Sequence, residues 1–244
     1  MTPRIIYEDR DFLIIDKPSG LIVHPARGER EGEREKREMT LVDWLVENYP
    51  EVRNVGDEPE TRPGIVHRLD KDTSGAMVIA RNQRAFEYLK RLFQNHEIKK
   101  TYLVLIWGEI REKSGIIDTP IGLKGGTIKR TVHTEGAKLV KEAVTKYKVL
   151  KILESNGGKL SLLEVEPLTG RTHQIRVHLN SIGHPVAGDP LYGKSKIKNQ
   201  ISKMLGLSRL FLHAESIEFT KPDGGRLKVS ADLPADLEQA LSQL

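Results

Sequence analysis

Short apolar runs, each bounded by turn-forming residues, recur along the chain. Several of them alternate between apolar and polar residues with the period of two that is typical of a strand half buried in a sheet. Each run ends near Gly, Pro, Asn or Asp, which are residues that favour turns. The pattern predicts six β-strands, in RIIYED (4–9), FLIIDKP (12–18), AMVIAR (76–81), TYLVLIWGEI (101–110), KLSLLEVEP (159–167) and LFLHAESIEF (210–219).

A longer period of three to four residues predicts two helices between these strands. Thr40 is a predicted N-cap for residues 41–49, and Asp43 stands three residues later, as in a capping box. Asn82 is a predicted N-cap for residues 83–96. Three apolar side chains of this second helix share one face, which is therefore expected to be buried: Phe86, Leu89 and Phe93.

The order of these elements indicates the fold class. Strands outnumber helices and do not alternate strictly with them, which argues against a doubly wound parallel sheet. We therefore expect an α+β fold with a mixed, largely antiparallel β-sheet flanked by helices and loops. No internal repeat and no clear linker divides the chain, so residues 1–244 are expected to form a single domain.

Two polar segments are predicted to be loops. GEREGEREKRE (28–38) mixes both charge signs with almost no apolar content, so the segment from about 26 to 39 is interpreted as a charged surface loop. An arm that contacts RNA remains an alternative for it. DEPETRPG (57–64) is the second loop, and it leads directly into a third polar segment.

Composition narrows the class of protein. The chain has 244 residues and no cysteine, which excludes a disulfide framework, a thiolate metal site and a cysteine nucleophile. The first twenty residues carry charges throughout and no apolar run is long enough for a membrane span, so the expected location is cytoplasmic. A net charge of +5 gives a mild bias toward polyanionic partners.

Two motif matches do not carry a function. GDPLYGKS (188–195) satisfies the phosphate-loop pattern, but Pro190 lacks an N–H and the preceding NSIGHPVA is not a strand. His173 and His178 are five residues apart, which places them on different faces of a helix, and no suitable further ligand stands beside them. We therefore expect neither a nucleotide cofactor nor a metal.

HRLDKDTSG (67–75) places several charged residues between two apolar runs. In one interpretation Asp72 forms an Asx-type turn with the residues after it, and Asp70 forms an ion pair with a neighbouring basic side chain on the surface. In the other, an arginine keeps Asp70 ionised, so that its carboxylate is available as a nucleophile or base. Loops at the ends of rigid strands are frequent positions for reactive groups.

A second polar segment, PLTGRTHQIRVHLNSIGHP (167–185), predicts a helix from about Thr172 to Ser181. His173 and Arg176 share a face of this helix, and Arg171 lies at its N-terminal end. An arginine on a packed helix is a fixed charge that could pair with Asp70 or hold a phosphate. A surface-exposed basic helix is the alternative.

Four motifs in this order resemble the RluA-type RNA pseudouridine synthase family: HRLDKDTSG, KKTYLVLIWG, GRTHQIRVHLNSIGHPVAGDPLYG and LFLHA. IIYEDRDFLIIDKPSGLIVHP is also typical of the start of this family, and the resemblance extends from about residue 5 to about residue 222. It implies the pseudouridine synthase fold and an isomerase that needs no cofactor. The implied partner is structured RNA, either rRNA or tRNA, and a monomer is the simplest expectation.

The resemblance also implies roles for individual residues. Asp70 matches the catalytic aspartate, and Arg68 matches an arginine that helps to displace the target base and fills its place. Tyr102 matches an active-site tyrosine that packs against the uracil, and Arg176 matches the basic residue that pairs with the aspartate. Leu212 matches an apolar wall of the pocket. Four further residues are assigned only to substrate positioning or RNA contact: His67, Arg171, His173 and Gln174.

The chain departs from many members of this family, which carry a small RNA-binding domain before the catalytic one. Here the first catalytic strand is predicted near Arg4, so no separate N-terminal RNA-binding domain is expected. Substrate selection is then expected in the catalytic domain or its loops. An RNA-binding or RNA-folding protein of the same fold, with catalysis lost or secondary, remains the alternative function.

Overall fold

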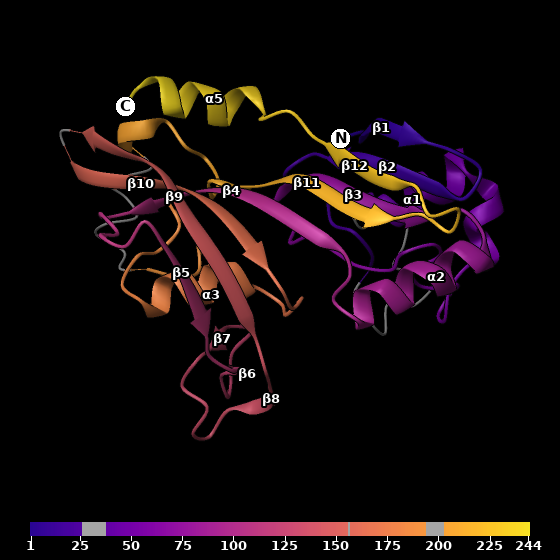
Figure 1. The fold of residues 1–244 in the computed structure, drawn as a ribbon, viewed down its shortest axis with the longest axis horizontal. Coiled ribbons are helices and arrows are strands. Elements are labelled where there is room, and N and C mark those ends of the chain that lie inside the picture. The colour runs from indigo at the N-terminus through magenta and orange to yellow at the C-terminus, as the bar shows by residue number, and fades with distance from the viewer. Residues whose placement is uncertain (26–37, 156, 194–202) are drawn as a thin grey trace. The chain divides into compact units, whose positions relative to one another are not determined.

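The computed structural model describes residues 1–25, 38–155, 157–193 and 203–244 (Figure 1). Most of the predicted charged loop at 26–39, including all of 28–37, lies outside the described residues. The chain divides into two compact units. Unit 1 consists of Met1–Ile98 and Ser216–Ala231, and unit 2 consists of Lys99–Glu215 and Asp232–Leu244.

Antiparallel strands form the framework of unit 1. β1 (Arg4–Glu8) pairs with β2 (Phe12–Lys17), and β2 pairs with β3 (Ser74–Ala80). The second half of β11 (Leu212–Thr220) forms a hairpin with β12 (Arg226–Ser230). All seven residues of β3 are buried, as the uninterrupted small and apolar sequence SGAMVIA requires.

The two helices of unit 1 begin at the predicted caps. Thr40 and Asp43 form a capping box at the start of α1 (Leu41–Asn48), where the Thr40 backbone N–H donates to the Asp43 carboxylate at 2.8 Å. The Asn82 side chain accepts from the Ala85 N–H at 2.9 Å and starts α2 (Gln83–Gln94). A short 3₁₀-helix, η2 (Pro50–Asn54), follows α1.

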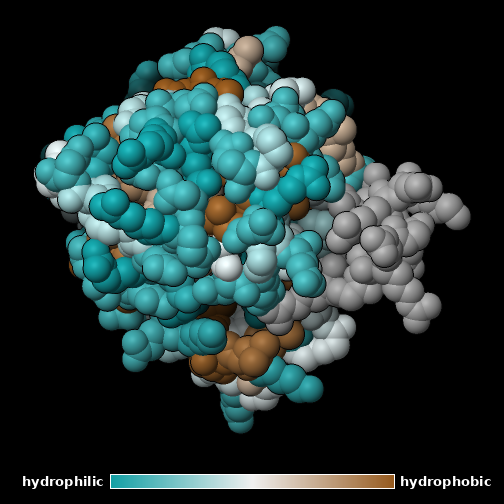
Figure 2. All heavy atoms as spheres, turned by 90° about the vertical axis from the view of Figure 1, so that its right-hand side faces the viewer, coloured by the Kyte–Doolittle hydropathy of each residue, from teal (hydrophilic) through white to brown (hydrophobic). Residues whose placement is uncertain are grey.

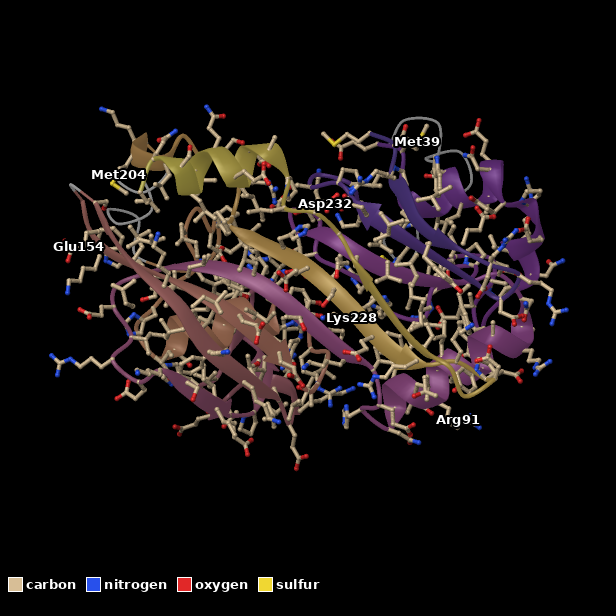
Figure 3. All side chains as sticks on the ribbon, turned by 45° about the horizontal axis from the view of Figure 1, so that its top comes forward. Met39, Arg91, Glu154, Met204, Lys228 and Asp232 are labelled. Atoms are coloured by element: carbon tan, nitrogen blue, oxygen red, sulfur yellow. The ribbon has the colours of Figure 1, made fainter. Side chains whose placement is uncertain are left out.

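The core of unit 1 lies between α2 and the strands. Phe86 and Leu89 are buried there and Phe93 is partly buried, which confirms the predicted apolar face of the helix. The opposite face is polar, and it carries Arg91, labelled in Figure 3, whose guanidinium lies over the Tyr88 ring at 5.1 Å from its centroid. The helix is therefore amphipathic, with one face on the core and one toward water.

Unit 2 is built on four antiparallel strands in the order β4, β10, β9, β5. β4 (Lys99–Trp107) and β10 (Gly158–Pro167) are the two strands predicted from the sequence. β9 (Val144–Ser155) and β5 (Ser114–Asp118) are additional strands with largely exposed or half-exposed residues. β9 and β10 pair over ten residues with one bulge between Leu162 and Leu163.

A small three-stranded sheet extends from one end of β5 and β9 (Figure 1). It consists of β6 (Ile121–Leu123), β7 (Arg130–Thr131) and β8 (Lys138–Lys141), with β6 in the centre. The chain enters it after β5 and returns into β9, and those two strands pair with each other. The small sheet is therefore an insertion at the end of a β-hairpin.

Two helices pack on the strands of unit 2. α3 (Gln174–Ser181) begins two residues later than predicted, because His173 adopts a left-handed conformation with φ 57° and cannot continue a right-handed helix. α5 (Ala235–Ser242) buries Leu237 and Ala240. The strand pairs β1–β2, β2–β3 and β11–β12 of unit 1 and β4–β10, β10–β9 and β9–β5 of unit 2 are antiparallel, and helices flank them, so the predicted α+β fold is confirmed.

Hydrophilic residues cover most of the face shown in Figure 2, and apolar groups interrupt it in separate patches. This distribution accords with a chain in which 30% of the residues are charged. Over the described part of the chain, no helix combines the length and the hydropathy needed to cross a bilayer.

Candidate active site

The loop that carries Asp70 leads into β3. Its turn is closed by the Thr73 N–H, which donates to the carbonyl oxygen of Asp70 at 3.2 Å. The Asp70 residue itself is partly buried, whereas Thr73 and Ser74 behind it are fully buried. The carboxylate therefore stands on a tight turn whose far side is fixed to the core of unit 1.

Lys17 anchors this loop from below. Its side chain is completely buried at the end of β2, and its ammonium group donates to the carbonyl oxygens of Pro18, Leu21 and Lys71 at 2.8, 2.9 and 3.1 Å. A buried ammonium group needs such acceptors, because an uncompensated charge in the core is costly. Lys17 was not among the predicted site residues, although it stands in the DKPSG turn that ends a predicted strand.

The turn after Lys17 adds two further hydrogen bonds to the same loop. The Gly20 N–H donates to the carbonyl oxygen of Lys71 at 2.9 Å, and the Ser19 hydroxyl donates to that of Asp72 at 2.8 Å. The two residues that directly follow Asp70 are thus bound through their backbone. This arrangement limits how far the Asp70 carboxylate can move.

Arg68 lies two residues before Asp70 and is exposed. One of its Nη1–H groups lies 3.1 Å from Nε2 of His24, and Nδ1 of His24 lies 2.9 Å from the carbonyl oxygen of Pro25. Burial lowers the pKa of His24 below its usual 6.5, and the positive charge of Arg68 lowers it further, against the carbonyl of Pro25. A neutral His24 with its proton on Nδ1 can donate to the Pro25 carbonyl oxygen and accept from Arg68 at Nε2. The ring therefore orients the Arg68 side chain.

His67 ties the start of the loop to its surroundings. Its Nε2 accepts from the Val78 N–H of β3 at 3.1 Å, and its ring stacks on Phe93 of α2 with the centroids 4.7 Å apart. The ring is thus held by a strand on one side and a helix on the other. In unit 1 the structure therefore brings three predicted residues into one anchored loop: His67, Arg68 and Asp70.

The remaining predicted residues lie in unit 2. Tyr102 on β4 is partly buried and packs on an apolar cluster that contains Leu212, at the start of β11, as well as Ile175 and Leu179 of α3. Leu212 is fully buried. One cluster therefore supports Tyr102, Leu212 and the helix that bears Arg176.

Arg176 is buried on α3, so the alternative of a surface-exposed basic helix is wrong. Its Nε and Nη2 atoms donate to the two carboxylate oxygens of Asp189 at 2.7 and 2.9 Å, and the side chains are 4% and 0% exposed. Asp189 was not a predicted site residue, although it lies in the GDPLYG part of the third motif. The pairing of Arg176 with Asp70 stays a prediction.

Asp189 also organises the turn that follows it. Its Oδ1 accepts from the backbone N–H groups of Leu191 and Tyr192 at 2.8 and 3.1 Å. In a phosphate loop such N–H groups would point at a phosphate, whereas here a carboxylate of the protein takes them. The described residues of GDPLYGKS, 188–193, therefore do not have the arrangement of a phosphate loop.

Gln174 fixes the N-terminal end of α3. Its Oε1 accepts from the Thr169 hydroxyl at 2.7 Å and from the Arg171 N–H at 3.0 Å. Its Nε2 donates to the carbonyl oxygen of Val144 at 2.9 Å and to the Thr145 hydroxyl at 3.0 Å. One buried amide therefore joins α3 to the loop before it and to the start of β9.

His178 lies on the same helix and is completely buried. Its Nδ1 lies 2.8 Å from the Thr145 hydroxyl and its Nε2 lies 2.9 Å from the carbonyl oxygen of Thr119. Burial lowers the pKa of His178, and the carbonyl of Thr119 opposes that effect in part. The ring is thus neutral near pH 7, with its proton on Nε2.

Two other predicted residues flank the start of α3. Nδ1 of His173 lies 2.9 Å from the Tyr192 hydroxyl, and Arg171 donates from Nε to the carbonyl oxygen of Glu142 at 2.9 Å. The Tyr192 hydroxyl also accepts from the Arg130 N–H of β7 at 2.9 Å. Arg171 and His173 are therefore attached to the protein on either side of the helix start.

Metal ligation has no support in the part of the chain that the structure describes, where no three His, Cys, Asp or Glu side chains gather in a group able to hold an ion. The chemistry that the arrangement offers is that of side chains: a carboxylate on an anchored turn, a tyrosine on an apolar cluster and a buried guanidinium. These groups suit acid–base or nucleophilic work on an organic substrate.

Comparison with known proteins identifies the class of protein. The sequence model of the family described as RNA pseudouridylate synthase matches residues 11–181, which is more than half of the chain. The chain therefore belongs to the RNA pseudouridine synthase family, and the predicted family and enzyme class, an isomerase that acts on RNA, are confirmed.

Two relatives illustrate the similarity. An uncharacterized RNA pseudouridine synthase of Aquifex aeolicus is 42% identical over 228 residues, which cover 92% of this chain and 67% of that protein. A ribosomal large subunit pseudouridine synthase D of Nitrosomonas europaea is 39% identical over 246 residues, covering 99% of this chain and 65% of that protein. The chain thus spans about two thirds of the length of these relatives.

Solved structures agree on the fold. Human RNA pseudouridylate synthase domain containing 1 has a TM-score of 0.75 and 28% identity, with 98% of this chain and 87% of that chain covered. Human RNA pseudouridylate synthase domain containing 4 has a TM-score of 0.73 and 24% identity, with 98% and 92% covered, and it supports the fold alone. The predicted pseudouridine synthase fold is therefore confirmed.

Proposed function

We propose that the chain converts uridines of structured RNA to pseudouridine and that Asp70 is its catalytic carboxylate. The observation that carries the proposal is the anchored loop: family membership supplies the reaction, and the HRLDKDTSG turn holds one carboxylate against β2 and β3 through Lys17, Ser19 and Gly20. We further propose that residues 1–244 act as one catalytic domain.

The reaction accounts for the residue types. The bond between uracil N1 and the ribose breaks, the uracil turns while it stays bound, and a new bond forms between its C5 and the same ribose carbon. The proton on C5 is lost and N1 gains one, so no electrons, metal or external energy source are needed. Asp70 can serve by attacking the sugar, by attacking the ring or by abstracting a proton from the sugar, and the proposal covers all three paths.

The other predicted residues have complementary roles in this proposal. Tyr102 packs against the detached uracil and Leu212 forms an apolar wall, and together they exclude water that would turn isomerisation into hydrolysis. Arg176 supplies a fixed positive charge for Asp70 or for a phosphate. Arg68 helps to displace the target base, and His24 orients the Arg68 side chain. RNA contact and positioning fall to His67, Arg171, His173 and Gln174.

The substrate is proposed as rRNA or tRNA that is modified in the cytoplasm by a monomeric enzyme. The name of the relative from Nitrosomonas europaea supports ribosomal RNA. Because the target base must leave its stack at a cost of a few kcal/mol, an unpaired loop uridine is the favoured target. Phosphate contacts by lysine and arginine should make the affinity fall with salt.

The test compares the parental chain with Asp70→Asn on rRNA and tRNA transcripts, using carbodiimide mapping of pseudouridine together with filter binding. We expect the parental chain to modify defined uridines. Asp70→Asn should abolish isomerisation and leave RNA affinity nearly intact or improved. Parental turnover in Asp70→Asn would remove Asp70 as the catalyst. RNA binding with no modification by the parental chain would favour the alternative, an RNA-binding protein with catalysis lost.

A further inference from the structure

The ion pair of Arg176 and Asp189 has a geometry that fixes one edge of the guanidinium. Nε and Nη2 both donate to the same carboxylate, so the guanidinium plane and the direction of the side chain are set together. The two hydrogen bonds to Asp189 use the Nε–H and one Nη2–H group of the arginine. The anionic group that Arg176 is proposed to meet, Asp70 or a phosphate, would therefore approach the edge formed by Nη1 and Nη2.

Asp189 is itself held rigidly. Its Oδ1 accepts two backbone N–H groups in addition to the guanidinium, and its side chain has no exposed surface. Gly188 before it has φ +73°, and a Cβ there would overlap the carbonyl oxygen of Arg209. The carboxylate is thus held by the backbone after it, and the backbone before it has little room to move.

Tyr192 covers the face of the same guanidinium. The Arg176 Cζ atom lies 5.2 Å from the centroid of the Tyr192 ring, within the range of a cation–π contact. The Tyr192 hydroxyl is held in turn by the Arg130 N–H and lies next to His173. The guanidinium is therefore fixed at its edge by Asp189 and across its face by Tyr192.

We propose that Asp189 is a positioning residue for pseudouridine formation, which holds the Arg176 guanidinium so that its Nη1–Nη2 edge meets the anionic partner in the reaction. This inference rests on the proposed function, because it assigns Arg176 to the reaction. Asp189 touches no substrate in it. Its negative charge also balances that of Arg176, which would otherwise be a costly buried cation.

The kinetic test uses Asp189→Asn in two backgrounds. In the parental background we expect kcat to fall about 100-fold and KM to change by less than about threefold, since a misplaced group costs turnover rather than binding. In the Arg176→Lys background, where a bidentate pair cannot form, Asp189→Asn should change kcat by less than about threefold. An equal fall in both backgrounds, or parental kcat in the single variant, would overturn the proposal.

Asp236→Asn is the matched control. Asp236 accepts from Nε and Nη2 of Arg209 at 2.6 and 3.0 Å in the same unit, but its side chain is 49% exposed. It should leave kcat within about twofold of the parental value, because surface pairs contribute little. Asp189→Glu keeps the negative charge and so guards against misfolding. Its kcat should lie between those of the parental chain and of Asp189→Asn. A kcat at or below that of Asp189→Asn would contradict positioning by the ion pair.

A second readout is independent of activity. The Nε–H resonance of Arg176, identified by its loss in Arg176→Lys, should exchange slowly with water in the parental chain and more than about tenfold faster in Asp189→Asn. It should be unchanged in Asp236→Asn. An unaltered exchange rate in Asp189→Asn would overturn the positioning role. If the resonance responds as expected while the parental chain makes no pseudouridine, the proposed function fails and the fixed guanidinium stands.

Discussion

The ammonium group of Lys17 and the carbonyl oxygen of Lys71 are 3.1 Å apart, although 54 residues separate them in the sequence. The same carbonyl accepts from the Gly20 N–H at 2.9 Å. Lys71 directly follows Asp70, so these two hydrogen bonds act on the peptide next to the proposed catalytic residue. The strand pairing explains how they meet, since Lys17 faces Gly75 in the register of β2 and β3.

Lys17→Met tests this anchor. The substitution keeps an unbranched side chain but leaves three carbonyl oxygens without their charged donor, so we expect the free energy of unfolding to fall by about 2–4 kcal/mol. Turnover should fall by about tenfold or more, because the Asp70 turn loses its fixed support. Urea denaturation and single-turnover kinetics at a temperature where the variant is folded measure the two effects.

Lys90→Met is the control for this variant. Lys90 lies on α2 of the same unit and pairs with Asp57 on the surface, with both side chains more than 40% exposed. We expect it to cost less than about 1 kcal/mol and to leave turnover unchanged. If Lys17→Met were as stable and as active as Lys90→Met, the anchoring role of Lys17 would be refuted.

Arg176→Ala should damage folding and turnover together. It removes the partner of a carboxylate that has no exposed surface, and breaking a buried pair in this way costs about 3–5 kcal/mol. Turnover should fall even at temperatures where the protein is folded, since the fixed positive charge is gone. Unchanged rates in the folded variant would remove Arg176 from the proposed site. Arg209→Ala breaks a pair in which the Asp236 carboxylate is 49% exposed and stays hydrated without its partner, so it should cost less, about 1 kcal/mol.

Periodicity predicted the framework well where one face of an element is buried. The caps at Thr40 and Asn82 and all six predicted strands are present, because a capping residue and a short apolar or alternating run between turn residues are local features of the sequence. β9 was not predicted because it contains three lysines and only two of its twelve residues are buried, so it has no continuous apolar face. The start of α3 was placed too early because nothing in the sequence signals that His173 adopts φ 57°.

Motifs predicted the site less completely than the fold. The proposed functional residues in HRLD, KTY and HQIR could be named because they stand in recognisable short segments. The residues that support them could not be named in this way. Lys17 and His24 contact the Asp70 loop from 54 and 44 residues away in the sequence, and Asp189 contacts Arg176 from 13 residues away. Such contacts follow from strand register and burial, which a single sequence does not reveal.

The two histidines with lowered pKa predict how stability depends on pH. Burial lowers the pKa of His24 and of His178 in the folded chain, whereas in the unfolded chain each binds a proton near pH 6.5. The unfolded state therefore binds more protons below that pH, so the free energy of unfolding should be largest above about 6.5 and decrease as the pH falls below it.

Urea denaturation at pH 7.5, 6.5 and 5.5 measures this effect above the range where carboxylates titrate. His178→Gln removes one of the two groups, so its stability should fall less steeply between pH 6.5 and 5.5 than that of the parental chain. An identical slope in the two proteins would show that His178 is protonated as readily in the folded chain as in the unfolded one.

Gly188→Ala should be far more harmful than the same change at a glycine with open space around it. At Gly188 the backbone has φ +73° and a Cβ would overlap the carbonyl oxygen of Arg209, so the turn must open and displace Asp189. We expect a loss of more than about 2 kcal/mol in the free energy of unfolding. Gly126→Ala, at φ +67° with no atom within 4 Å, should cost only about 1 kcal/mol.

Because the displaced carboxylate is the partner of Arg176, Gly188→Ala should also lower kcat in the folded fraction, whereas Gly126→Ala should not. Urea denaturation measures both losses of stability. Equal losses in the two variants would mean that the positive φ alone, and not the close approach of the Arg209 carbonyl oxygen, is the reason why position 188 requires glycine.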